Sequence, residues 1–252
     1  MNMREKSTRR YFFRSATVLG TGLVLDGCGG KRTIEKQSED RTPSEKVGSK
    51  TDIEVTAVED LMREHGVLRR ALFVYTETAA RLRGDPATVA LEPLQKAARL
   101  FRAFGEDYHE RKLEEAHIFP AVRKAGGEAA GYVDVLITQH QRGREITDYI
   151  LTATQSPESG AAGARQLGQA LDSLVRMYRP HAAREDTVIF PAWKQTLTAA
   201  QLDEMGDRFE DIEHEQFGED GFENAVKQIA EIETSLGLAD LGRFTAPSPP
   251  TR

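Results

Sequence analysis

The sequence has one cysteine, no long hydrophobic run and no excess of basic residues. The lone cysteine, Cys28, excludes a disulfide within the chain. A transmembrane helix needs roughly 20 consecutive apolar residues, and no such run is present. The net charge of -6, with arginines interspersed among acidic residues, argues against a nucleic-acid-binding surface.

Apolar residues recur at helical spacing in four long segments, and no segment shows the alternation of a strand. The chain is long enough to bury one core of domain size. We therefore predict an all-α fold, an up-down four-helix bundle with one or two extra C-terminal helices. The predicted long helices cover about residues 57–83, 87–124, 128–154 and 161–194, and the shorter ones 199–217 and 222–236.

The first 28 residues have the features of an export signal. Arg9 and Arg10 precede aromatic residues and a short apolar run over residues 16–25, which resembles a twin-arginine signal; a Sec-type signal is the alternative. Leu25-Asp-Gly-Cys28 resembles a lipoprotein cleavage box, with plain signal cleavage or an uncleaved anchor as alternatives. We expect the chain to be exported to the periplasm or the outer face of the envelope, lipid-anchored at Cys28.

The domain organisation follows from these patterns. Residues 1–28 form the predicted signal, and residues 29–52, rich in Lys, Glu, Ser and Thr, form a predicted disordered tether. The helical domain covers residues 53–236, and residues 237–252, which include three prolines, form a predicted flexible tail. The membrane is expected as a partner only through the N-terminal anchor.

Two copies of a histidine and carboxylate motif end in Ile-Phe-Pro. In the downstream copy, His181 and Glu185 lie four residues apart and so share one face of a helix. The upstream copy contains His109 and Glu114, and aligning the two Ile-Phe-Pro ends superposes Glu114 on Glu185. The acids that follow, Glu115 and Asp186, superpose as well, so the chain contains an internal repeat.

The repeat extends upstream of each motif. His65 and His140 are each followed four residues later by an arginine, Arg69 and Arg144. Each of the four long helices therefore contributes a histidine. A single buried histidine is usually a satisfied core residue, but four at repeated positions with paired carboxylates indicate a metal site. Imidazole and carboxylate ligands suit non-haem iron, with manganese or zinc as alternatives.

With these residues the chain resembles the hemerythrin-like (HHE cation-binding) family over about residues 53–195. The resemblance implies a hemerythrin-type bundle that holds two non-haem iron ions. It implies that His65 and His109 hold one iron, that His140 and His181 hold the other, and that a bridging pair of carboxylates joins them, namely Glu114 and Glu185.

The implied function is binding of dioxygen or a related small oxidant, such as peroxide or nitric oxide, in the cell envelope. A di-iron oxidase or peroxidase, and iron or zinc storage without redox chemistry, are the alternatives. The sequence identifies neither a catalytic residue nor a redox partner.

Two features depart from the pattern of the family. Arg144 stands where oxygen-carrying hemerythrins have a second histidine on the third helix, and arginine has no lone pair to give a metal. The departure favours oxygen or peroxide chemistry over reversible oxygen carriage. The offset of five residues from His109 to Glu114 would turn the carboxylate about 140° away in a regular α-helix. We therefore predict a π-bulge between His109 and Glu115.

Three residues near the motifs are left outside the predicted site. His117 forms a Glu-x-x-His spacing with Glu114 but has no counterpart in the other copy, so we expect it not to bind metal. Tyr108 is expected to be a packing residue, the alternative being a hydrogen-bond donor to the cluster. His214 lies in an acidic run on a C-terminal helix and is expected at the surface, the alternative being a ligand folded back over the site.

Overall fold

The computed structural model describes residues 55–155, 161–218 and 221–250, and these ranges are helical without a strand. The all-α prediction is confirmed. The predicted export signal and tether lie outside the described residues. The elements are α1 (Ala57–Gly84), η2 (Pro86–Thr88), α2 (Leu91–Leu100), η3 (Phe101–Ile118), α3 (Phe119–Ala125), α4 (Gly127–Ala130), α5 (Val133–Gln155), α6 (Ala161–Arg184), η4 (Glu185–Ile189), α7 (Phe190–Gln195), α8 (Ala199–Phe217), α9 (Gly221–Ser235) and η5 (Leu241–Phe244).

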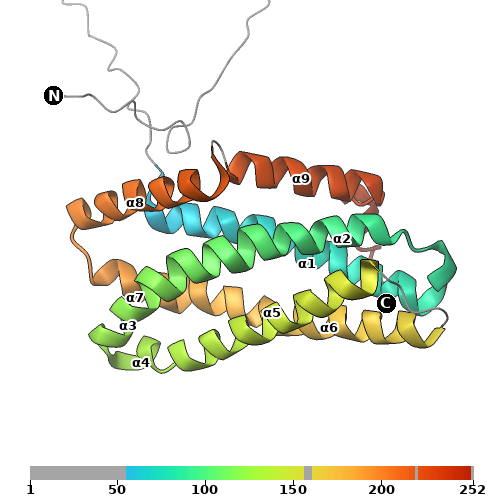
Figure 1. Ribbon diagram of the computed structural model, residues 1–252, viewed down its shortest axis with the longest axis horizontal. Helices are drawn as coiled ribbons and strands as arrows, with labels where there is room; N and C mark the ends of the chain where they lie inside the picture. The colour runs from blue at the N-terminus through green and yellow to red at the C-terminus, as the bar shows by residue number, and fades with distance from the viewer. Residues whose placement is uncertain (1–54, 156–160, 219–220, 251–252) are drawn as a thin grey trace, which may run out of the picture. The chain divides into compact units, whose positions relative to one another are not determined.

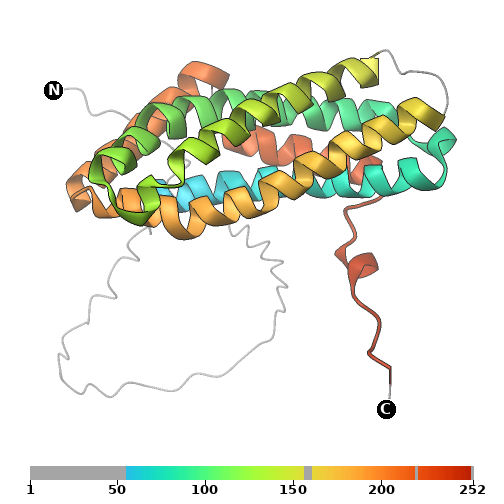
Figure 2. The same ribbon diagram turned by 90° about the horizontal axis from the view of Figure 1, so that it is seen from below.

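Four long rods run side by side (Figures 1 and 2). They are α1, the continuous run α2–η3–α3, α5, and the continuous run α6–η4–α7. The two C-terminal helices, α8 and α9, pack on α1, α2 and η3, away from α5 and α6 (Figure 1). The bundle therefore has two extra helices on one side, as predicted.

Local sequence signals set the helix ends. Thr56 and Glu59 form a capping box at the start of α1, with the Glu59 N–H donating to Thr56 Oγ1 at 3.3 Å. Gly126 and Gly127 have φ angles of 77° and 76°, which favour glycine, and they separate α3 from α4. The second rod begins at Leu91 rather than near residue 87, because the Pro86 turn forms the short helix η2 first.

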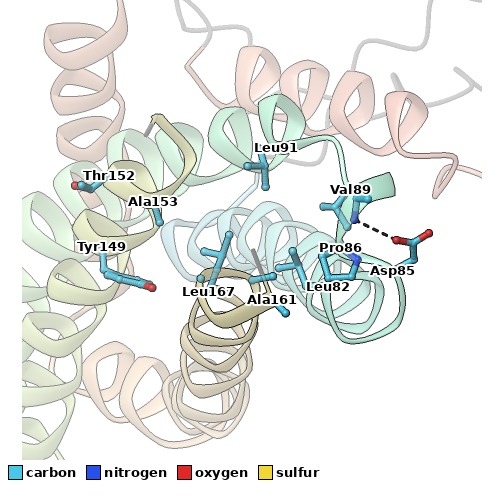
Figure 3. Close-up of a pocket in the computed structure, with 13 residues that line it drawn as sticks. Leu82, Asp85, Pro86, Val89, Leu91, Tyr149, Thr152, Ala153, Ala161 and Leu167 are labelled. Carbon is cyan, nitrogen blue, oxygen red and sulfur yellow. Dashed lines mark hydrogen bonds between the residues drawn. The ribbon is translucent and has the colours of Figure 1, made fainter. Parts of the chain in front are cut away.

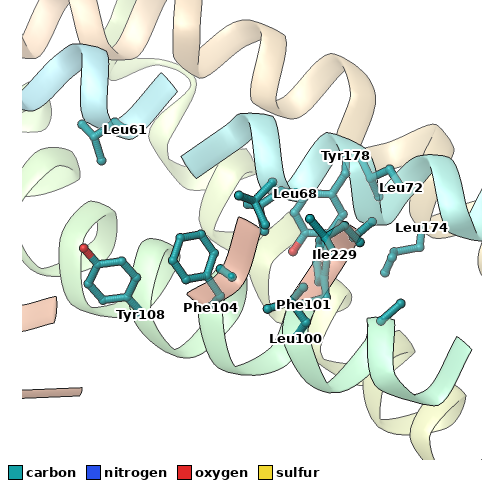
Figure 4. Close-up of a cluster of buried hydrophobic side chains, with 14 of the residues drawn as sticks. Leu61, Leu68, Leu72, Leu100, Phe101, Phe104, Tyr108, Leu174, Tyr178 and Ile229 are labelled. Carbon is teal, nitrogen blue, oxygen red and sulfur yellow. The ribbon is translucent and has the colours of Figure 1, made fainter. Parts of the chain in front are cut away.

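The hydrophobic core fills the space between the rods and α9. Large side chains from α1, η3, α6 and α9 meet there (Figure 4). Phe101 and Phe104 are at most 1% exposed, and each such buried side chain stabilises the fold by about 1.5–3 kcal/mol. This packing fixes the rods against one another and so determines which polar side chains meet inside the bundle.

A cavity of about 500 Å³ lies where α1 ends, between α2, α5 and α6 (Figure 3). Its described lining is mostly apolar, and the one charged lining residue, Asp85, caps η2 by accepting the Ala87 N–H at 3.2 Å. Leu82 in its wall is 17 residues beyond His65 on α1, which corresponds to about 25 Å along the helix. This cavity is remote from the predicted metal site.

No helix within the described ranges combines the length and the apolar character that crossing a bilayer requires.

Candidate metal centre

The four repeated histidines are all buried and come from four different rods. His65 lies on α1, His109 on η3, His140 on α5 and His181 on α6. The Nε2 atoms of His65 and His109 are 3.1 Å apart, and those of His140 and His181 are also 3.1 Å apart. The structure therefore brings the predicted histidines together as two pairs, in the grouping that the sequence predicts.

The two predicted bridging carboxylates each span both histidine pairs. Glu114 Oε1 lies 3.4 Å from Nε2 of His109, and its Oε2 lies 3.3 Å from Nε2 of His140. Glu185 Oε1 lies 3.1 Å from Nε2 of His181, and its Oε2 lies 3.6 Å from Nε2 of His65. One oxygen of each carboxylate thus faces each pair.

This donor set fits a pair of cations. Both oxygens of Glu114 and both of Glu185 are buried without a hydrogen-bond partner among the described residues. A buried acceptor that lacks a donor destabilises a fold unless something else compensates it. His65, His109 and Glu114 form one set whose ligand atoms lie within 4.8 Å of one another, and His140, His181 and Glu185 form a second.

The predicted irregularity after His109 is confirmed and is longer than one residue. All of η3 is π-helical, and the Phe119 N–H donates to the Glu114 carbonyl, five residues back. This spacing matches the five-residue offset from His109 to Glu114, so both side chains face the interior. The sequence did not predict η4, where the Phe190 N–H likewise donates to the Glu185 carbonyl.

Both π-helical segments end at an Ile-Phe-Pro motif. Pro120 and Pro191 follow Phe119 and Phe190 directly, and proline has no N–H to donate to the carbonyl four residues back. The series of backbone hydrogen bonds along the helix is therefore interrupted at the same proline in each copy of the repeat. In both copies the proline lies six residues after the bridging carboxylate, Glu114 or Glu185.

Each histidine is oriented by a polar side chain from a neighbouring rod. The Nδ1 atoms lie 2.6–2.9 Å from these partners, which accept the Nδ1–H of a neutral imidazole and leave the Nε2 lone pair facing the interior. The pairs are His65 with Asp186, His109 with Glu64, His140 with Glu115, and His181 with Gln139. Together they close a ring of contacts around the four rods.

Sequence reasoning missed this ring, although the repeat contains its signal. Glu115 and Asp186 are the second acids of the two twin-acid motifs, and Glu64 and Gln139 directly precede the first histidine of each copy. Matched positions in the repeat therefore supply matched partners.

Arg144 does not face the histidine nitrogens. Its guanidinium donates to Glu115 Oε1 at 2.5 Å and to Glu110 Oε2 at 3.2 Å. A third group of possible ligands, comprising Glu110, Glu115 and His140, thus has a guanidinium against both of its acids. The equivalent arginine, Arg69, donates to Asp186.

Two tyrosines contact this network. Tyr108, expected to be a packing residue, instead follows the alternative and donates a hydrogen bond to Glu64 at 3.1 Å. Tyr178 donates to Glu110 at 2.5 Å, and burial, with the charge of Glu110, raises the pKa of Tyr178 well above 10. Gly143 makes room for this ring, since a Cβ there would lie 2.2 Å from the Tyr178 hydroxyl.

The remaining histidines lie outside the centre. His214 is exposed, so the alternative that it folds back over the site is wrong. His117 is partly buried and packs its ring against Phe209 at 5.8 Å. Burial lowers the pKa of His117, and it belongs to none of the described groups of possible ligands.

The charges at the centre stabilise one another. Burial alone would lower the pKa of His109, but Glu114 and Glu64 outweigh it and raise the pKa well above 6.5. Burial would raise the pKa of Glu185, but the neighbouring histidines, His181 foremost, hold it well below 4.5. Protons therefore compete with a cation for the histidine nitrogens, so metal binding releases protons.

Replacing Asp186 by alanine should weaken metal binding by about 10- to 100-fold, because His65 loses the partner that fixes its tautomer and orientation. A competition titration against a chelator of known affinity measures the change. Asp172→Ala is the matched control, since Asp172 of α6 pairs with Arg83 of α1 at the surface, whereas Asp186 of η4 pairs with α1 at the centre. Equal affinities for the two variants would contradict the assigned role.

Comparison with known proteins also indicates cation binding. The model of the hemerythrin HHE cation binding domain matches the chain in two overlapping segments, residues 56–193 and 133–237. The uncharacterized proteins Rv1995 of Mycobacterium tuberculosis and Mb2018 of Mycobacterium bovis are each 42% identical over 239 residues, covering 94% of this chain and 90% of theirs. No solved structure matches the chain.

Proposed function

Because the chain belongs to the hemerythrin HHE cation-binding family, we propose that it holds two iron ions and binds dioxygen or a related small oxidant, such as peroxide or nitric oxide. The single observation that carries the proposal is the arrangement of Glu114 and Glu185. Each spans both histidine pairs, and its buried oxygens have no hydrogen-bond partner in the part of the chain that the structure describes.

Iron is proposed from the chemistry of the donors. Four imidazoles and two carboxylates suit a divalent or trivalent transition metal better than magnesium or calcium, which prefer oxygen ligands. His65, His109 and Glu114 would hold one ion, and His140, His181 and Glu185 the other. When bound, iron would supply the electrons that reduce or reversibly bind an oxidant.

The residues of the chain supply binding, orientation and exclusion of water. The ring of Nδ1 contacts holds each imidazole with Nε2 inward, and the bridging carboxylates keep the two sets together. The ligand side chains are at most 4% exposed, which shields the centre from bulk solvent. Tyr178 and Glu110 place a protonated phenol and a carboxylate beside the site.

The proposed location is the cell envelope, with the domain attached through a lipid at Cys28. This part of the proposal rests on the arginine pair, the short apolar run and the Cys28 box at the N-terminus. Export of a folded chain would allow the metal to be loaded before translocation.

The test is elemental analysis of protein purified without added metal, together with absorption spectra recorded with and without oxygen. We expect two iron atoms per chain and a near-ultraviolet band that depends on oxygen. Protein without a bound transition metal would exclude the proposal. Zinc without an oxygen-dependent band would instead indicate metal handling without redox chemistry.

A further inference from the structure

The cavity where α1 ends has the size and the lining of a binding site for a small molecule. Its volume is about 500 Å³, and pockets that bind small molecules range from roughly 300 to 1,000 Å³ and are lined mainly by apolar side chains. Leu82 of α1, Leu91 of α2 and Leu167 of α6 form the inner part of the lining (Figure 3). Leu82 and Leu167 are each only 4% exposed. A molecule in this cavity would therefore contact mostly hydrocarbon.

Small side chains on two neighbouring helices leave this space open. Ala161, Ala164 and Leu167 follow one another at intervals of three residues, so they lie on one side of α6. Ala153 contributes another small side chain from α5, which packs against α6. A larger side chain at Ala153 or Ala164 would project into the cavity and take up part of its volume. The cavity can therefore be filled by single substitutions in its wall.

The polar groups of the lining lie at its solvent-exposed edge. Asp85, Tyr149 and Thr152 all line the cavity and are all exposed, Tyr149 at 40%. Asp85 Oδ1 accepts the Ala87 N–H, and within the described ranges the second oxygen of Asp85 and the Tyr149 hydroxyl have no hydrogen-bond partner. Apolar side chains inside and open polar groups at the edge suit a ligand with an apolar body and one polar end.

The charge of the lining disfavours anions. Asp85 is the one charged side chain in the described lining, and the whole chain has a net charge of -6. Arg83, two residues before Asp85, pairs with Asp172 instead of lining the cavity. A ligand carboxylate or sulfonate would be repelled by Asp85, whereas a hydroxyl or amine N–H could donate a hydrogen bond to it.

We propose that this cavity binds an uncharged, mainly hydrocarbon molecule that carries a hydrogen-bond donor at one end. An apolar cavity of about 150 Å³ holds one benzene ring, so by proportion this cavity holds about 20 non-hydrogen atoms. A bilayer lipid with two acyl chains is larger than this and would not fit whole. The site is separate from the proposed metal centre, because Leu82 lies about 25 Å along α1 from His65.

The test is a titration of the purified protein with N-phenyl-naphthylamine, an uncharged dye of this size whose fluorescence rises in apolar surroundings. Anilino-naphthalene sulfonate has the same rings and adds a negative charge. Ala164→Phe places a benzene ring in the wall and so fills roughly a third of the cavity. Ala162→Phe is the matched control, because Ala162 lies on the same helix, is exposed and does not line the cavity.

We expect saturable binding of the uncharged dye to the wild type, weakened about tenfold or more in Ala164→Phe and unchanged in Ala162→Phe. The sulfonated dye should bind roughly threefold more weakly than the uncharged one. Asp85→Asn should narrow that difference, since it removes the charge but keeps an oxygen for the Ala87 N–H. Absence of saturable binding, or equal affinities of the wild type and Ala164→Phe, would overturn the proposal. A sulfonated dye that binds as tightly as the uncharged one would overturn the ligand class.

A second variant keeps the test independent of how well Ala164→Phe folds. Ala153→Leu fills the cavity from α5 instead of α6 and should also weaken binding of the uncharged dye. Circular dichroism and the unfolding midpoint identify the variants that are folded, and only these are compared. Metal content measured on the same samples should equal that of the wild type. Dye binding that disappears when the metal is removed from the wild type would place the dye at the metal centre and would contradict the proposal.

Discussion

Removing the metal is expected to destabilise the folded chain by about 4 kcal/mol when the free metal concentration is about a thousand times its dissociation constant. The metal binds the folded chain and not the unfolded one, because the ligands come from four rods that meet only in the bundle. Without metal, the four buried oxygens of Glu114 and Glu185, which have no hydrogen-bond partner among the described residues, would be left uncompensated.

Thermal unfolding with and without a chelator measures this effect. For a chain of this size, 1 kcal/mol corresponds to about 2–4 °C, so the unfolding midpoint should fall by roughly 8–16 °C. The His140→Ala, His181→Ala double variant lacks one of the two sets of ligands, so the chelator should shift its midpoint much less. An equal shift in the wild type and the double variant would show that the stabilising metal lies elsewhere.

The buried histidines and carboxylates of the centre are costly to the fold when no metal is bound. Burying imidazoles and carboxylates in place of apolar groups removes them from water without an apolar gain. Six such side chains, the four histidines and the two glutamates of the centre, are buried. This is expected of residues that serve binding rather than stability.

The sequence predicted the main ligands of this centre because they occupy matching positions in the two copies of the repeat. Matching the two Ile-Phe-Pro endings paired Glu114 with Glu185, and the five-residue offset from His109 predicted a departure from α-helical geometry that η3 confirms. Both inferences depend on positions along one helix, where residue spacing translates directly into direction.

The contacts between helices were not predicted, since they depend on how the rods are rotated and displaced relative to one another. Glu64 lies next to His65 in the sequence, yet it contacts His109 on another rod. His65 is contacted instead by Asp186, which lies on the fourth rod. Tyr108 was assigned to packing for the same reason, because its partner Glu64 lies 44 residues away in the chain.

The buried carboxylate of Glu106 should make stability depend on pH in the opposite direction to most acids. Burial, and then the charge of Glu110, raises the pKa of Glu106 to about 7, although Thr147, Arg102 and Arg144 act to lower it. Between pH 4.5 and 7 the folded chain therefore holds a proton that the unfolded chain has released. Stability from this group is present below pH 4.5 and is lost as the pH rises to 7, by about 3 kcal/mol.

Glu106→Gln should remove this loss, because the amide stays neutral at every pH and its oxygen can still accept the Thr147 hydroxyl, which donates to Glu106 at 2.6 Å. Arg102 lies 2.9 Å from Glu106 and keeps a second carboxylate partner in Asp148 at 2.5 Å, so the substitution does not isolate its charge. Relative to the wild type, the variant should gain about 3 kcal/mol of stability between pH 4 and pH 8.

Denaturant unfolding of both proteins across this pH range, with chelator present, isolates the contribution of Glu106, because the metal ligands titrate alike in the two. Glu92→Gln is the control. Hydrogen bonding and charge from Lys96 lower the pKa of this exposed carboxylate, so the stability of the variant relative to the wild type should fall, rather than rise, with increasing pH. A constant difference between Glu106→Gln and the wild type would mean that Glu106 is ionised in the folded chain. The polar groups around it would then stabilise its charge, and the buried network beside the metal centre would carry one more negative charge at neutral pH.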